Sequence, residues 1–133
     1  MPATLSKPAL DVGLISTNGE SMVAFYHGVL GLSQDPDVTI PGYGTIHKFN
    51  CGGSILRVMV PESAPEKVAG GDFMSRDGIR YITLNVDNLD ELVAECKDFG
   101  CEVPVDIREL RPGVRCAQVK DPDGNHVEFI TEK

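Results

Sequence analysis

The chain has 133 residues and a mass of 14.4 kDa, and its 41% hydrophobic and 24% charged residues are typical of one soluble globular domain. Twelve Lys and Arg against twenty Asp and Glu give a formal charge of −8. This charge argues against nucleic acid and anionic membranes as partners, because their phosphates require a basic surface. Without a signal peptide, a membrane-length apolar run or paired cysteine motifs, we expect a cytoplasmic protein with free thiols.

The first half of the chain predicts a strand, a helix and three more strands. Residues 10–15 alternate between apolar and polar side chains as a strand does, and residues 21–30 carry apolar side chains at helical spacing. The helix ends at Gly31, as expected of a left-handed position after a helix. Three strands follow, at residues 34–40, 45–50 and 54–60.

The second half repeats the same plan. A strand at 80–86 leads into a helix at 91–99, which ends at Gly100. Three strands again follow, at residues 103–109, 115–120 and 125–131.

One βαβββ module therefore occurs twice, at residues 9–61 and 79–131, joined by a linker at 62–78 that is rich in Pro, Gly, Glu and Ala. Neither half has enough strands to cover its own sheet. We therefore expect the modules to form one domain, paired within the chain or exchanged between two chains.

Three motifs lie on this repeated plan. They are FYHGVLGL at 25–32, NVDNLD at 85–90 and DPDGNHVEF at 121–129. The last contains a turn in which Gly124 takes a positive φ and the aspartates cap their own backbone. In this order and spacing, the motifs resemble the vicinal oxygen chelate superfamily, which includes glyoxalases, bleomycin resistance proteins and extradiol dioxygenases. The resemblance implies an α+β fold of curved, cup-shaped mixed sheets.

In that family, the first and last strands of each module supply the ligands of a metal ion, usually His or Gln and Glu. The resemblance places Asp11, Arg57, Tyr81 and Glu128 at these four positions. Glu128 alone matches a common ligand, because a guanidinium cannot coordinate a cation and a phenol must first ionise. We therefore expect no metal, with Arg57 in its place, where it compensates Asp11, Glu128 or an anionic ligand. The alternative is that Arg57 forms a surface ion pair of little energetic weight.

Strand alternation predicts which other side chains face the cup. Tyr81 and Glu128 are candidates for an acid and a base acting on a carbonyl compound. If a divalent Fe, Mn, Ni or Zn ion is bound, we expect Glu128 to share it with His47, which the internal repeat aligns with Gln118. The expected ligand-binding residues are Asp11, Arg57, Met59, Thr83, Asn85 and His126.

Two functions remain open at this point. The altered metal positions favour a metal-free protein that binds a small molecule, similar to the bleomycin resistance proteins, although the lack of Trp argues against a large flat ligand. Glu128 and the fold favour instead a metal-dependent lyase, isomerase or dioxygenase acting on a small oxygenated substrate. A homodimer is expected in both cases, because the modules need partners to complete their cups.

Overall fold

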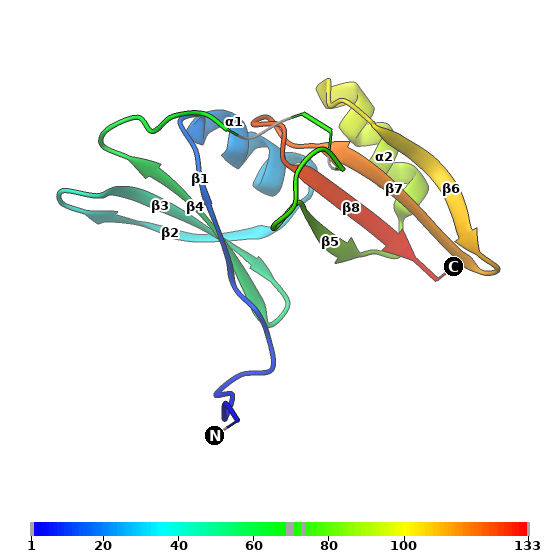
Figure 1. Ribbon diagram of the computed structural model, residues 1–133, viewed down its shortest axis with the longest axis horizontal. Coiled ribbons are helices and arrows are strands. Elements are labelled where there is room, and N and C mark those ends of the chain that lie inside the picture. The colour runs from blue at the N-terminus through cyan, green and yellow to red at the C-terminus, as the bar shows by residue number, and fades with distance from the viewer. Residues whose placement is uncertain (1, 69–70, 73, 133) are drawn as a thin grey trace. The chain divides into compact units, whose positions relative to one another are not determined.

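A computed structural model of the protein describes residues 2–68, 71–72 and 74–132. The chain divides into two compact units, Met1–Glu66 and Lys67–Lys133, and the boundary falls inside the predicted linker (Figure 1). Residues 69, 70 and 73 of that linker lie outside the described residues. Among the helices of the described part, none is long and apolar enough to cross a membrane.

Unit 1 is a four-stranded mixed sheet with one helical segment. Its strand order is β1-β4-β3-β2, with β1 parallel to β4 and the other neighbours antiparallel. The elements are β1 (Val12–Ile15), α1 (Gly19–Val23), η1 (Ala24–Val29), β2 (Ser33–Ile40), β3 (Gly44–Cys51) and β4 (Ser54–Pro61).

The predicted first helix is present, but its second half, η1, is a π-helix. The wider π-turn lets two neighbouring aromatic side chains, Phe25 and Tyr26, both point at the sheet, where both are fully buried. Their ring centroids lie 4.9 Å apart, and the Tyr26 ring lies 5.9 Å from the ring of Phe49 on β3. The helix ends as predicted, with Gly31 at a φ of 72°.

Unit 2 repeats the βαβββ plan with the strand order β5-β8-β7-β6. β5 is parallel to β8, and the other neighbours are antiparallel. The elements are β5 (Tyr81–Asn85), α2 (Leu89–Phe99), β6 (Val105–Arg111), β7 (Val114–Lys120) and β8 (His126–Thr131). The α+β fold class and the repeated module predicted from the sequence are therefore confirmed.

The turn between β7 and β8 has the predicted chemistry. The buried Asp121 carboxylate accepts backbone hydrogen bonds at 2.9 Å from Asp123 and Asn125, and a third from the Asn125 side chain. Gly124 takes a φ of 89°. This turn fixes the register of β7 against β8, and hence which β7 side chain lies beside Glu128.

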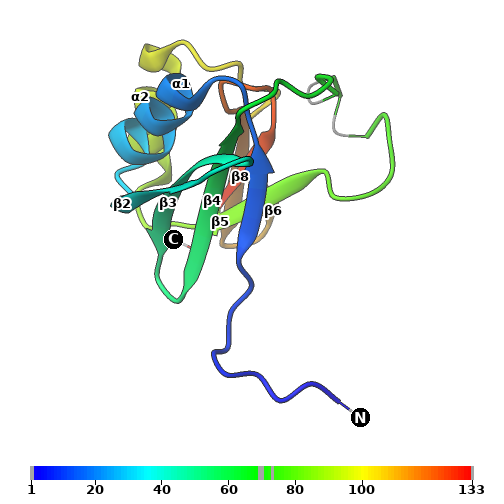
Figure 2. The same cartoon turned by 90° about the vertical axis from the view of Figure 1, so that its left-hand side faces the viewer.

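Each sheet has one face covered by its own helix and one face without a helix, here called the open face. Figure 2 shows α1 on one side of the unit 1 strands. On β8, Val127 and Phe129 are fully buried towards the helix, whereas Glu128 and Ile130 alternate with them and are half-buried on the open face. The predicted alternation is thus confirmed for this strand.

Candidate functional site

Asp11 is the first of the four positions at which the resemblance places a metal ligand, and in unit 1 its carboxylate is in contact with two cationic side chains. Its Oδ1 accepts hydrogen bonds from Lys7 Nζ at 2.8 Å and from the Ile55 backbone N–H at 2.9 Å, and its Oδ2 lies 3.5 Å from Arg57 Nη1. The Lys7 and Ile55 hydrogen bonds, with the nearby charges of Lys7 and Arg57, lower the pKa of Asp11. A divalent ion does not fit this carboxylate, because ammonium and guanidinium groups already lie against both of its oxygens.

The contact between Arg57 and Asp11 is therefore present, and it is open to solvent. The Arg57 side chain is 41% exposed and that of Asp11 is 25% exposed. An ion pair this exposed contributes little to stability. Arg57 thus lies beside Asp11 in an exposed ion pair, which agrees with the alternative of a surface ion pair of little energetic weight and leaves the replacement of a metal ion as a proposal.

The rest of the unit 1 open face carries an apolar row across all four strands. The strand register aligns Ile15 with Met59, Met59 with Ile46, and Ile46 with Val38. Ile15 is 55% exposed and Val38 is 40% exposed. Met59, one of the predicted ligand-binding residues, is thus part of an apolar surface that no helix of this unit covers.

In unit 2, the open face gathers the predicted residues of β5 and β8. The register pairs Tyr81 with His126, Thr83 with Glu128, and Asn85 with Ile130. The Thr83 hydroxyl donates a hydrogen bond of 2.9 Å to Glu128 Oε1. Thr83, rather than Tyr81, is therefore the direct neighbour of the carboxylate on β5.

Gln118 is a site residue that the sequence analysis missed. It pairs with Glu128 in the β7–β8 register and shares the open face with it, so that Thr83, Glu128 and Gln118 form a polar row. Gln118 is 5% exposed, and its buried Oε1 has no hydrogen-bond partner among the described residues. The alternation of β7, with the register set by the Asp121 turn, is the signal that identifies it.

The expected equivalence of His47 and Gln118 is wrong. Lys48, not His47, pairs with Arg57, just as Gln118 pairs with Glu128. Between these pairs the chain is one residue longer in unit 2, and a slip of one residue moves a strand's side chains to the opposite face. His47 therefore lies on the helix-covered face opposite Val58, where its Nδ1 is 2.9 Å from Asp37 Oδ1. This placement does not support His47 as a metal ligand on the open face.

The metal expected of the family requires several donors around one point. Among the residues that the structure describes, no three His, Cys, Asp or Glu side chains group closely enough to hold an ion. In unit 2, Glu128 has a hydroxyl and an amide as its register neighbours, which is a weak donor set for a divalent cation.

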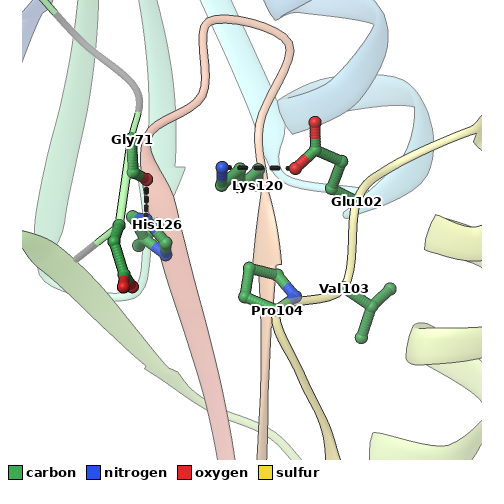
Figure 3. A pocket seen from close by; sticks show the side chains of 7 residues that line it. Gly71, Glu102, Val103, Pro104, Lys120 and His126 are labelled. Carbon is green, nitrogen blue, oxygen red and sulfur yellow. Dashed lines mark hydrogen bonds and ion pairs between the residues drawn. The ribbon is translucent and has the colours of Figure 1, made fainter. Parts of the chain in front are cut away.

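A cavity of about 300 Å³ lies at the His126 end of the unit 2 open face (Figure 3). His126 is 2% exposed, and its Nε2 lies 3.1 Å from the Gly71 carbonyl oxygen, which accepts the hydrogen bond. Lys120, the register partner of His126, places its Nζ 3.2 Å from Glu102 Oε2. The predicted ligand-binding residue His126 thus lines a cavity, but one nitrogen of its ring is held by the linker backbone.

The comparisons with known proteins agree with this architecture. The family model of the Glyoxalase/Bleomycin resistance protein/Dioxygenase superfamily matches residues 10–129. The chain therefore belongs to this superfamily, as the three motifs indicated. A comparison with curated protein sequences finds no match.

Solved structures share the fold at low sequence identity. SMU.1112c is 20% identical with a TM-score of 0.78, and the match covers 95% of this chain and 99% of that one. Lactoylglutathione lyase from Agrobacterium tumefaciens is 21% identical with a TM-score of 0.66, covering 96% of both chains. TnmS3, an antibiotic binding protein from Streptomyces sp. CB03234, is 17% identical with a TM-score of 0.70, covering 96% of this chain and 98% of that one.

Proposed function

We propose that the protein binds a small molecule on the open faces of its sheets, without a metal ion. The observation that carries this proposal is the arrangement around Asp11, where Lys7 and Arg57 lie against the carboxylate at the position where the family places a metal ligand. A carboxylate neutralised by two cations has little affinity for a third.

The side chains on the open faces suit a small organic ligand. On the unit 2 open face, the polar side chains of Thr83, Gln118 and Glu128 lie beside the apolar side chains of Ile130 and Cys116, the mixture that small-molecule sites usually present. Binding of a small molecule also has a parallel among the structures that share this fold, one of which is TnmS3, an antibiotic binding protein. With 6% aromatic residues, this chain has few stacking surfaces, so a compact ligand suits it better than a large flat one.

The proposal includes a homodimer. The unit 1 open face leaves Ile15, Val38 and Ile40 at 55, 40 and 39% exposure, and apolar side chains gathered on one face favour a protein partner. A second copy of the chain is the simplest partner, because a two-fold interface needs one self-complementary surface. Light scattering during size exclusion should give twice the chain mass of 14.4 kDa, whereas a monomer at all concentrations would contradict this part.

Metal analysis tests the proposed function. The protein is expressed in medium supplemented with Mn, Fe, Ni and Zn, purified without chelators and analysed by mass spectrometry of its elements. We expect well below one equivalent of any of these metals, and the same value for Glu128→Ala and for the control Glu109→Ala on β6. One equivalent that is lost only in Glu128→Ala would contradict the proposal and favour the metal-dependent lyase, isomerase or dioxygenase.

A further inference from the structure

The buried amide of Gln118 requires an explanation. Buried polar atoms in proteins almost always have hydrogen-bond partners, and an unsatisfied acceptor carries a desolvation cost. Gln118 is 5% exposed, and no described residue donates to its Oε1. A buried acceptor that has no donor among the described residues is suited to a donor that arrives with a ligand.

Glu128 places a second acceptor next to this amide. The two residues are direct register partners on antiparallel strands and share the open face, so their Cβ atoms are about 5 Å apart. Thr83 donates to Oε1 of the carboxylate. Because both side chains start from paired positions on one face, Glu128 Oε2 and Gln118 Oε1 can accept from the same small polar group.

The charges around this pair favour a cationic donor. Lys120, next to Gln118 on the same face of β7, is compensated by Glu102 at 3.2 Å. Arg108 lies on the exposed edge strand β6, where solvent screens its charge. Asp72, which lines the neighbouring cavity, adds a negative charge, and Arg80, whose Nη2 donates to the Asp72 carbonyl oxygen at 2.9 Å, adds a positive charge beside it. The chain as a whole carries −8.

We propose that Gln118 and Glu128 together recognise an N–H donor group on the ligand, a protonated amine or amidine. The group donates one hydrogen bond to Gln118 Oε1 and a charge-assisted one to the Glu128 carboxylate, and the planar amidinium matches two neighbouring acceptors best. The cavity of about 300 Å³ beside Lys120 and His126 has room for a further part of the ligand (Figure 3). This inference rests on the proposed small-molecule binding and specifies its ligand class.

The test uses three matched probes, benzamidine, benzylamine and benzoate, in titrations followed by ¹H–¹⁵N NMR. Benzamidine and benzylamine should shift the amide signals of Thr83, Gln118 and Glu128, with benzamidine binding more tightly, and benzoate should leave these signals in place. Benzoate shifting them as strongly as benzamidine would overturn the inference. The inference would also be overturned if neither benzamidine nor benzylamine shifted these signals at millimolar concentrations.

Variants at matched positions separate recognition from structure. Gln118→Met keeps the length of the side chain but removes the amide, and it should weaken benzamidine about tenfold or more, whereas Gln118→Glu should retain binding. Lys48→Met, the control at the equivalent register position of unit 1, should not change benzamidine affinity. The thermal midpoint of Gln118→Met should stay unchanged or rise, because the substitution removes a buried acceptor that has no donor among the described residues.

Unchanged benzamidine affinity in Gln118→Met, or a lowered thermal midpoint, would overturn the inference by assigning Gln118 a structural role or none. Failure of this inference and failure of the proposed function remain distinguishable. Benzoate bound at Gln118 and Glu128 would leave small-molecule binding intact and reject the cationic class. One equivalent of metal lost on Glu128→Ala would reject the proposed function itself.

Discussion

The two units have the same register positions on their open faces and fill them with opposite chemistry. In unit 1, the two middle strands pair Arg57 with Lys48, two cations. In unit 2, the equivalent positions pair Glu128 with Gln118, two acceptors. The helix-covered faces differ less, since each is built around fully buried apolar side chains, such as Phe49 in unit 1 and Phe129 in unit 2. Packing against a helix constrains one face of each repeat to apolar side chains, whereas the open faces carry different polar groups in the two units.

The largest effects should come from the buried apolar side chains that the helix-covered faces of both units contain. Phe49→Ala in unit 1 and Phe129→Ala in unit 2 each remove a fully buried ring. Each should lower the free energy of unfolding by about 3–5 kcal/mol, through lost burial and the cavity left behind. Urea unfolding measures both. A loss below about 1 kcal/mol in either variant would mean that the helix-covered faces of the two units do not contribute equally to stability.

A smaller effect is expected at the turn that gives unit 2 its longer connection. Asp121→Ala leaves two backbone N–H groups and the Asn125 amide without their acceptor. The loss should be about 1–3 kcal/mol in urea unfolding, the usual cost of donors left unsatisfied. Asp106→Ala, at an exposed carboxylate of β6, is the control and should change stability little. If both variants lost the same free energy of unfolding, the Asp121 turn would not be what fixes the register of β7 against β8.

The ion pair in unit 1 should contribute much less. Arg57→Met removes one of two cations beside Asp11 and leaves the Lys7 and Ile55 hydrogen bonds in place. The free energy of unfolding should fall by less than about 1 kcal/mol, as expected for an exposed pair. A loss of about 3–5 kcal/mol would indicate instead a buried pair in which one charge is left uncompensated.

The smallest effect is the contribution of Asp11 to the pH dependence of stability. Its folded pKa is lowered below the ordinary value of 3.8, mainly by the Lys7 and Ile55 hydrogen bonds. Because the unfolded state binds the proton more readily, this carboxylate stabilises the fold above about pH 4, and the contribution is lost as the pH falls through the folded pKa. Asp11→Asn should therefore lose less stability than the parent protein between pH 5 and about pH 3. Parallel pH profiles would contradict this assignment.

Much of the fold was predictable because the signals are local. Strand alternation, the capping glycines Gly31 and Gly100 and the Asp121 turn depend on neighbouring residues, and the structure contains each of them. The π-helical turn was not predictable, because apolar spacing alone does not separate an α-helix from a short π-helix.

The site was harder to predict, because it depends on how strands pair. A constant offset between the repeats aligned His47 with Gln118. Between the paired positions the chain is one residue longer in unit 2 than in unit 1, so the residue equivalent to Gln118 is Lys48, and His47 lies on the other face of β3. Gln118 was overlooked for the same reason. The burial of His126 under Gly71 depends on the path of the linker, for which the sequence carries no periodic signal.

Manganese titration followed by NMR tests most directly whether the cations at Asp11 have replaced a metal ion. Bound Mn²⁺ broadens the amide signals of nearby residues at substoichiometric concentrations. If the cations have replaced a metal ion, Mn²⁺ should not selectively broaden the amide signals of Asp11, Gly13, Ile55 and Arg57 in the parent protein. The spectra of Glu128→Ala should respond to Mn²⁺ in the same way. Selective loss of these signals at a small fraction of one equivalent of Mn²⁺ would contradict this replacement.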